Sequence, residues 1–278
     1  MHIKRNIVLE GKHHRPILAD IYLEENSTNL PLALFAHGYK GFKDWGYWDL
    51  VAKEFAKNGY CFVKFNFSHN GGTVDQPIDF PDLEAFALNN FTIELDDLDT
   101  VINWVSSDEF DFSESVDVKS ITLIGHSRGG GIAAIKAAED SRITKLVTWA
   151  SVCDFKARFA DEEARAFWKN QGVIYMENSR TKQQMPHFYQ FYEDFMANEE
   201  RLTIKRAVQA LSIPFLIVHG TEDPTVDLKE AKALHSWNAN SKILVIDGAD
   251  HVFGGQHPWE KLTLPEHMRE VVATSIAF

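Results

Sequence analysis

The chain has 278 residues, of which 45% are hydrophobic, and its 40 acidic against 28 basic residues give a formal net charge of −12. This length and apolar content suffice for one large hydrophobic core, so we expect a single α/β domain over residues 1–278. The acidic balance argues against nucleic acid or an anionic membrane as a partner, because phosphate groups would be repelled.

The two cysteines and the N-terminal residues indicate in which cellular compartment the protein lies. The two cysteines, Cys61 and Cys153, lie in apolar runs, which indicates reduced core thiols rather than a disulfide framework. The amino terminus is basic but leads into no apolar run of the length of a signal peptide or a membrane span. We therefore expect a cytoplasmic protein.

Short apolar runs typical of buried β-strands recur along the chain, at residues 17–23, 32–36, 61–67, 121–124, 146–150, 215–218 and 243–246. Helical segments alternate with them, at residues 48–58, 95–105, 130–140, 228–237 and 266–276. Strands buried on both faces and alternating with helices predict a mostly parallel sheet with helices on both faces. The runs before residue 32 predict antiparallel strands at one edge.

A Gly-x-Ser-x-Gly motif, residues 125–129, stands between an apolar strand-like run and an alanine-rich helical segment. This arrangement is typical of a nucleophile elbow, in which a strained turn between strand and helix presents a serine to the substrate. Glycines at 125 and 129 avoid the collision that a side chain would make with the neighbouring strand or helix. We therefore interpret Ser127 as a nucleophile.

The same glycines permit a second interpretation. Gly125, Gly129 and Gly131 also resemble the phosphate-binding turn of short-chain dehydrogenases, with Asp154 where a ribose-binding acid would lie. In that family the turn follows the first strand, whereas several strand-like runs precede this one. A Tyr-x-x-x-Lys at residues 60–64 also lies upstream of the turn, the wrong order for that family's catalytic pair. The hydrolytic interpretation is therefore favoured.

A serine nucleophile needs a histidine that removes its proton and a carboxylate that fixes the histidine tautomer. His251 directly follows the last strand-like run and is the favoured base among the 12 histidines. Asp223 follows the run at 215–218 and is the favoured acid, because the order Ser127, Asp223, His251 is that of an α/β-hydrolase. The alternatives are His257 and His267 for the base and Asp154 for the acid.

Negative charge that develops on the substrate oxygen needs two backbone N–H donors. We expect these from Arg128, which follows the nucleophile at a helix start, and from Tyr39 in the glycine-containing loop 37–41. The chain has no His-Glu-x-x-His and no paired-cysteine motif, so we expect neither a metal nor a cofactor. An acidic cluster at residues 94–99 begins a helical segment, where carboxylates favour the helix dipole without an ion.

Residues 155–206 break the alternation of strands and helices. The stretch is charged, aromatic-rich and too long for an ordinary connection, so we interpret it as an inserted helical lid. An insertion after the strand that ends near residue 150 emerges at the carboxyl edge of the sheet, and we therefore expect Trp168 and Tyr175 to line the substrate pocket. Four more aromatic residues have the spacing of a helix packed on the core, with substrate contact as the alternative: Phe188, Phe191, Tyr192 and Phe195.

Four motifs in chain order resemble one family: His-Gly-Tyr at 37–39, Gly-His-Ser-x-Gly-Gly at 125–130, Gly-Thr-Glu-Asp at 220–223 and Gly-Ala-Asp-His at 248–251. Together they resemble the serine α/β-hydrolases, above all the cinnamoyl and feruloyl esterases and the acylaminoacyl-peptidase-like hydrolases. The resemblance implies the α/β-hydrolase fold, no cofactor, a triad of Ser127, Asp223 and His251, and oxyanion donors at Tyr39 and Arg128. Arg128 departs from the glutamine often found after the nucleophile in cinnamoyl esterases.

These residues predict an enzyme that hydrolyses small-molecule carboxylic esters of small or aryl acyl groups through an acyl-serine intermediate. A peptidase or amidase acting on small acylated peptides would use the same residues. A non-catalytic binding protein with the same fold is a third interpretation, against which the intact set of reactive residues argues.

Overall fold

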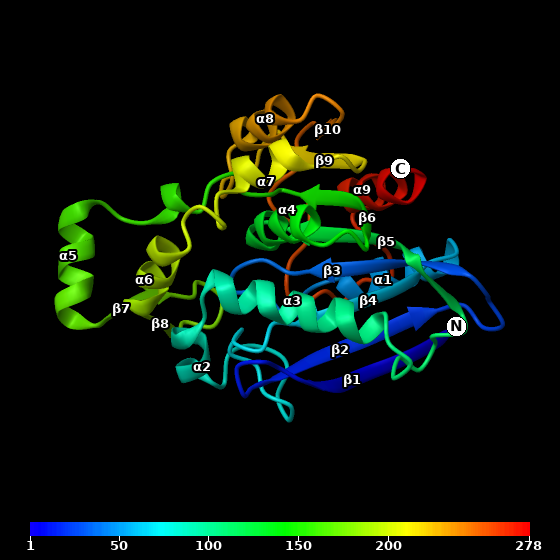
Figure 1. Ribbon diagram of the computed structural model, residues 1–278, viewed down its shortest axis with the longest axis horizontal. Coiled ribbons are helices and arrows are strands. Elements are labelled where there is room, and N and C mark those ends of the chain that lie inside the picture. Colours follow the sequence, from blue (N-terminus) through cyan, green and yellow to red (C-terminus); the bar gives the residue numbers. More distant parts are fainter.

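The computed structural model describes residues 1–278. Its main strands are β1 (His2–Glu10), β2 (Pro16–Leu23), β3 (Leu30–Ala36), β4 (Cys61–Asn66), β5 (Val116–His126), β6 (Ile143–Trp149), β9 (Phe215–Gly220) and β10 (Lys242–Ile246). They form one eight-stranded sheet in the order β1-β2-β4-β3-β5-β6-β9-β10 (Figure 1). Strand β2 pairs antiparallel with β1 and β4, and all other neighbours are parallel. The predicted mostly parallel sheet with antiparallel edge strands is confirmed.

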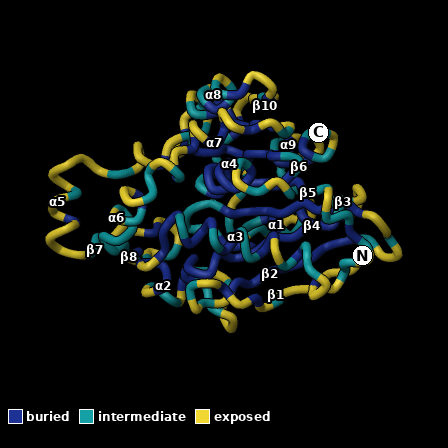
Figure 2. Tube along the Cα trace, in the orientation of Figure 1, coloured by how far each residue is buried: buried dark blue, intermediate teal, exposed yellow.

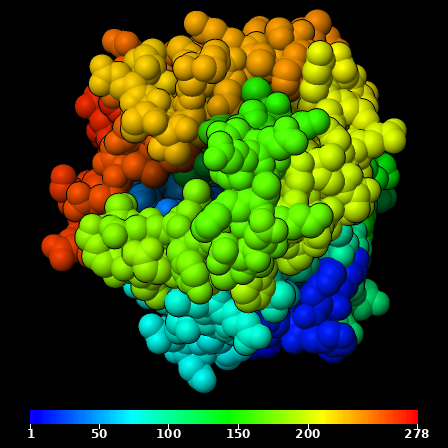
Figure 3. Space-filling view, turned by 90° about the vertical axis from the view of Figure 1, so that its left-hand side faces the viewer, coloured from blue at the N-terminus to red at the C-terminus, as the bar shows by residue number.

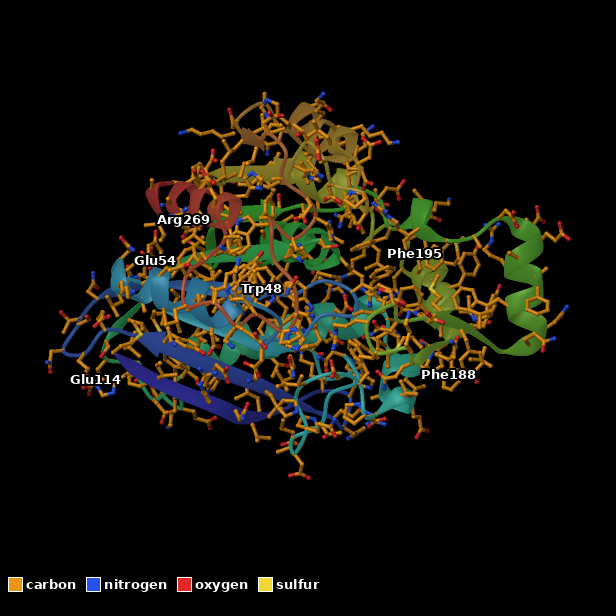
Figure 4. All side chains as sticks on the ribbon, turned by 180° about the vertical axis from the view of Figure 1, so that it is seen from behind. Trp48, Glu54, Glu114, Phe188, Phe195 and Arg269 are labelled. Carbon is orange, nitrogen blue, oxygen red and sulfur yellow. The ribbon has the colours of Figure 1, made fainter.

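Helices cover both faces of this sheet and enclose two hydrophobic cores. On one face lie α3 (Phe91–Val105), α4 (Arg128–Glu139), α7 (Ile204–Ala210) and α8 (Leu228–Trp237). On the other face lie α1 (Trp48–Lys57) and α9 (Glu266–Ala277), and Figure 4 labels Glu54 and Arg269 on these two helices. Because both faces are covered, the six residues of β4 are all buried, which explains why both of its faces carry apolar side chains: Cys61, Val63 and Phe65 on one and Phe62 on the other.

The stretch between β6 and β9 is an insertion with helices and one hairpin. It contains a 3₁₀ turn (Lys156–Arg158), α5 (Glu162–Gln171), β7 (Val173–Glu177), β8 (Gln184–Phe188) and α6 (Gln190–Ala197). β7 and β8 pair antiparallel. This hairpin is not among the predicted elements, because β7 is too exposed to carry the apolar pattern of a buried strand. The α7 helix begins inside the predicted boundary 155–206 yet packs into the core through Ile204, so the insertion ends before it.

The insertion lies at the carboxyl end of the parallel strands. Figure 1 shows α5, the hairpin and α6 at one end of the molecule, with short α2 (Leu83–Leu88) nearby. Figure 2 shows the sheet interior buried, whereas α5 and the hairpin are mainly exposed or half-buried. The insertion therefore extends from the domain at the edge where the loops after β3, β5, β9 and β10 meet.

The two cysteines are free thiols, Cys61 buried and Cys153 half-buried. Burial raises the pKa of each thiol to about 12, so neither carries appreciable thiolate at neutral pH. None of the helices combines the length and the apolar character that crossing a membrane requires.

Candidate active site

Ser127 stands on a sharp turn between strand and helix. Strand β5 ends at His126 and α4 begins at Arg128, which leaves Ser127 alone between them. Its backbone has φ 57° and ψ −121°, a conformation that L-residues rarely adopt. Such strain is kept only where the surrounding structure enforces it, and here it turns the serine side chain toward the edge of the sheet.

Two glycines permit this turn. A Cβ atom on Gly125 would stand 2.6 Å from the Cα atom of Gly130 in α4. A Cβ atom on Gly129 would collide with the carbonyl oxygens of Ala36 and His37 at the end of β3. The first glycine therefore lets the helix approach its own strand, and the second lets it approach the neighbouring strand.

The side chains of Ser127, His251 and Asp223 are joined by hydrogen bonds. The Nε2 atom of His251 lies 3.0 Å from the Oγ atom of Ser127, and its Nδ1 atom lies 2.7 Å from Oδ2 of Asp223. A carboxylate only accepts, so Nδ1 carries the proton and Nε2 is free to accept one from the serine hydroxyl. The three residues that the sequence predicts as a triad thus meet, although they come from loops after β5, β9 and β10.

Asp223 is held as an oriented anion. Its Oδ1 atom accepts hydrogen bonds from the backbone N–H groups of Thr225 and Val226, at 2.8 and 2.9 Å. Burial alone would raise the pKa of this carboxyl, but the hydrogen bond and charge of His251 and the two amides hold the pKa below its usual range. The carboxylate therefore stays ionised and fixes the imidazole in one tautomer.

The alternative residues have other partners. The carboxylate of Asp154 accepts from the backbone N–H groups of Lys156 and Ala157 and so closes the turn after β6. His257 accepts from the backbone N–H of Gly46, and His267 belongs to α9. Only His251 forms a hydrogen bond with the hydroxyl of Ser127, and the carboxylate bonded to His251 is that of Asp223 and not of Asp154.

The two predicted N–H donors lie beside Ser127. A Cβ atom on Gly38 would stand 2.9 Å from Cβ of Ser127, so the loop after β3 passes directly alongside the serine. The N–H of Tyr39, in this loop, donates to no group of the protein. The N–H of Arg128 is the first of α4 and has no carbonyl partner within the helix. Both N–H groups are therefore free to bind an oxygen atom.

A cavity of about 140 Å³ opens at Ser127. It is lined by the loop 37–41, by Trp45 and Trp48, and by His126, Ser127, His251 and Val252. Figure 3 shows a hollow on the same end of the molecule, between the green insertion and the orange C-terminal segments, with blue atoms of the N-terminal part inside it. A benzene molecule fits an apolar cavity of about 150 Å³, so this space accepts about one ring or a short chain.

The expectation that Trp168 and Tyr175 line this cavity is wrong. Trp168 is only 4% exposed, but its indole N–H donates to the backbone carbonyl of His187, 2.8 Å away, and fixes α5 to the hairpin. Tyr175 lies on β7 and is 61% exposed. The cavity wall is instead formed by Trp45 and Trp48, which lie just after the loop 37–41. Their place in the sequence close to that loop is the one signal that points to them.

Two of the three aromatic residues of α6, Phe191 and Phe195, pack on the core, as their spacing predicts. Tyr192 is not part of the core, and its ring centroid lies 5.1 Å from that of Phe159. Phe191 and Phe195 contact Phe91 of α3, with ring centroids 4.7 and 6.1 Å apart. Phe188 ends β8 instead and is not part of the helix. Figure 4 shows Phe188 and Phe195 on the insertion, whereas Trp48 lies near the centre of the molecule.

His126 contacts both the backbone and the ring of His251. Its Nε2–H donates to the backbone carbonyl of His251, 2.9 Å away, and the two rings lie 4.9 Å apart. Burial lowers the pKa of His126 to about 3, with the neighbouring His251 adding to the effect, so this imidazole is neutral at pH 7. The sequence did not identify this contact, because a histidine inside the elbow motif has no signature of its own.

The side chain of Arg128 forms an ion pair with Glu94 and no hydrogen bond with Ser127. Its Nε atom donates to both carboxylate oxygens of Glu94, at 3.0 and 3.2 Å, and the Nδ2 atom of Asn89 also donates to Glu94. The guanidinium lies 5.0 Å from the ring centroid of Tyr39 and 5.3 Å from that of Phe91. The ion pair of Arg128 and Glu94 therefore has no net charge, and it connects α4, the helix that follows Ser127, to α3.

Three carboxylates, of Asp20, Asp44 and Asp49, come close enough together to suggest a metal site. The ammonium of Lys64 lies among them, at 3.0, 2.6 and 2.7 Å, and that of Lys43 contacts two of them at 2.8 and 2.7 Å. The position that a cation would take is therefore filled by lysine. We interpret this cluster as a buried ion-pair network that connects β2 and β4 to the loop before α1.

A larger hollow, of about 450 Å³, lies away from the serine, beside the end of α4. Charged side chains dominate its wall, and two of them, Glu139 and Arg201, pair with each other at 2.8 Å. Neither a serine nor a histidine lines it. It therefore offers no reactive group, and the cavity at Ser127 is the candidate site.

Comparisons with known proteins support this fold. A curated relative, 2-hydroxymuconate semialdehyde hydrolase of Pseudomonas sp. (strain CF600), is 22% identical over 280 residues, which cover 92% of this chain and 89% of that protein. Est1E from Butyrivibrio proteoclasticus, solved with ferulic acid bound, superposes with a TM-score of 0.73 at 16% identity, over 98% of this chain and 97% of that one. The esterase domain of a Rhodothermus marinus protein gives a TM-score of 0.61 at 19% identity over 91% of each chain.

The solved structures share the fold, which confirms the predicted α/β-hydrolase architecture. The BD-FAE family model matches residues 19–238, most of the chain, including Ser127 and Asp223. This match removes the dehydrogenase interpretation of the glycine-rich turn. The chain belongs to the BD-FAE family of α/β-hydrolases.

Proposed function

We propose that this protein is a serine hydrolase that cleaves carboxylic esters of small or aryl acyl groups through an acyl-serine intermediate. The observation that carries the proposal is the hydrogen-bonded series Ser127, His251 and Asp223 on a strained elbow. A serine hydroxyl is almost fully protonated at neutral pH, so it attacks a carbonyl only with a base in contact with it. Here that base is His251.

In the first step the Oγ atom of Ser127 attacks the ester carbonyl carbon while Nε2 of His251 takes the hydroxyl proton. The carbonyl oxygen becomes an oxyanion, which accepts hydrogen bonds from the N–H groups of Tyr39 and Arg128. Asp223 stabilises the imidazolium that forms and does not itself take the proton. The free state of both N–H groups supports this assignment.

In the second step the tetrahedral intermediate collapses. The bond to the alcohol oxygen breaks, and His251 returns its proton to this oxygen, which leaves the acyl group on Ser127. A water molecule then attacks the acyl carbon and gives its proton to His251. The carboxylic acid leaves, and Ser127 recovers its proton.

Two further observations support small or aryl substituents. The cavity at Ser127 accommodates about one ring, and the flat walls of Trp45 and Trp48 suit a ring at little entropic cost. The solved relative Est1E was captured with ferulic acid, an aryl acid, bound.

The test is turnover of a set of p-nitrophenyl and aryl esters by the wild-type protein and by the Ser127→Ala variant. We expect the wild type to cleave short-acyl and aryl esters, and the variant to be slower by at least about a thousandfold with an unchanged melting temperature. Substantial turnover by pure Ser127→Ala protein, or no turnover of any ester by the wild type, would contradict the proposal.

A further inference from the structure

One charged residue that lines the cavity at Ser127 has a side chain whose charge is not balanced by the protein. Lys40 belongs to the loop 37–41 and lines this cavity together with Ser127 and His251. No carboxylate oxygen lies within 4.0 Å of the ammonium of Lys40. The ammonium also donates no hydrogen bond to another group of the protein.

The position of this ammonium is defined by an aromatic ring rather than by a carboxylate. Its Nζ atom lies 5.2 Å from the ring centroid of Tyr39. A cation above a ring is attracted to it, but the ring does not neutralise the charge. Burial lowers the pKa of the Lys40 ammonium, as expected of a cation that has lost water without gaining an anion.

The other walls of the cavity bring no negative charge. Burial lowers the pKa of His37 to about 4 and that of His126 to about 3, so both imidazoles are neutral at pH 7. No aspartate or glutamate lines the cavity. Arg128 approaches the same Tyr39 ring, but Glu94 neutralises it. Lys40 is therefore the one lysine, arginine, aspartate or glutamate among the lining residues, and its ammonium lacks a counter-ion in the protein.

We propose that this cavity receives an ester that carries a carboxylate close to the scissile bond, and that the ammonium of Lys40 recognises this carboxylate. The inference rests on the proposed ester hydrolysis and adds the substrate class to it. A charge-assisted hydrogen bond is stronger in a half-buried site than in water. Because the cavity holds about one ring, the substrate is a half-ester of a compact dicarboxylic acid or an ester of a compact hydroxy acid.

The test uses two pairs of esters, each matched in shape and different in charge. In the first pair the carboxylate belongs to the acyl part of the ester: monomethyl glutarate is compared with the methyl ester of glutaric acid monoamide. In the second pair the carboxylate belongs to the alcohol part: 4-acetoxybenzoate is compared with 4-acetoxybenzamide. We expect wild-type kcat/KM to favour the carboxylate by at least about tenfold in one pair at low ionic strength.

The variants then assign this preference to one side chain. Lys40→Met keeps an unbranched side chain, one atom shorter, but removes its charge, so the ratio within the favoured pair should fall to about one. Lys40→Arg should keep the preference, because it keeps the charge. Lys119→Met is the matched control, since it removes an exposed lysine from the opposite end of β5 and should leave the ratio as in the wild type.

Binding gives a second measurement that does not depend on turnover. The Ser127→Ala protein should bind 4-acetoxybenzoate or monomethyl glutarate at least about tenfold more tightly than its amide, and adding Lys40→Met should remove the difference. A wild-type ratio near one in both pairs, or one unaffected by Lys40→Met, would overturn the inference while ester hydrolysis stands. If the wild type cleaves neither these four esters nor any of the p-nitrophenyl and aryl esters, the proposed function fails. Equal binding of acid and amide by the Ser127→Ala protein would overturn the carboxylate site whether or not any ester is cleaved.

Discussion

The carboxylate of Asp223 bonds to His251 through one oxygen and to the backbone through the other: its Oδ2 atom lies 2.7 Å from Nδ1 of His251, and its Oδ1 atom accepts two backbone N–H groups. Asp223→Asn should lower kcat by about three to four decades, because an amide favours the wrong imidazole tautomer. The measurement is steady-state hydrolysis of a short-chain ester. Asp154→Asn, at the rejected position, is the control, and a greater loss of kcat from Asp154→Asn than from Asp223→Asn would show that the acid lies in the other loop.

Length of the acyl chain tests the size of the cavity. Each methylene that is buried contributes about 0.8 kcal/mol, so kcat/KM should rise with chain length only until the cavity of about 140 Å³ is full. Short-acyl and aryl esters should therefore be cleaved better than esters of long fatty acids. A kcat/KM that still rises beyond about ten acyl carbons would show that a lipid tunnel is present instead.

The sheet and the reactive residues could be predicted because their signals are local. Strands buried on both faces leave continuous apolar runs, and the glycines at 125 and 129 report a close approach that the structure contains. The cavity wall could not be predicted in the same way. Trp168 is aromatic and lies on the insertion, yet its indole faces the hairpin, a direction that depends on the β7–β8 pairing. The contact of His126 with His251 could not be predicted either, because it joins residues 125 positions apart in the chain.

Substitution of Gly129 tests the close approach of α4 to the end of β3 at the nucleophile elbow. A Cβ atom at this position would collide with the carbonyl oxygens of Ala36 and His37, so Gly129→Ala should cost about 2 kcal/mol or more in the free energy of unfolding. Gly59→Ala is the matched control, because Gly59 has φ +82° but no heavy atom within 4 Å of the added Cβ. It should cost only about 1 kcal/mol. Equal costs in urea unfolding would contradict the close approach.

Asp97 should make stability depend on pH. Its Oδ2 atom accepts from the backbone N–H of Ser68, but its Oδ1 atom is buried without a partner, and burial raises the pKa of the carboxyl to about 7. The unfolded carboxyl has a pKa of about 3.9, so the folded state binds more protons between these values. The contribution of Asp97 to stability is therefore fully present below about pH 4 and is lost as the pH rises through about 7.

The Asp97→Asn variant removes this ionisation. Relative to the wild type, its free energy of unfolding should rise between pH 4.5 and pH 8, by at most about 4 kcal/mol at about 1.4 kcal/mol per pKa unit. Urea unfolding at the two pH values measures the difference. Asp108→Asn, at an exposed position, corrects for the change in net charge. The same difference from the wild type at both pH values would mean that Asp97 does not titrate in this range.

Covalent labelling of Ser127 tests the central claim most directly. A fluorophosphonate reacts only with a serine whose proton is removed by a nearby base, so mass spectrometry of digested protein should find one phosphonyl group per chain, on the peptide that contains Ser127. Hydrolytic activity should be lost in proportion to labelling, and folded Ser127→Ala protein should remain unlabelled. Labelling of a different residue, or full ester hydrolysis by protein that carries the label on Ser127, would contradict the assignment of Ser127 as the nucleophile.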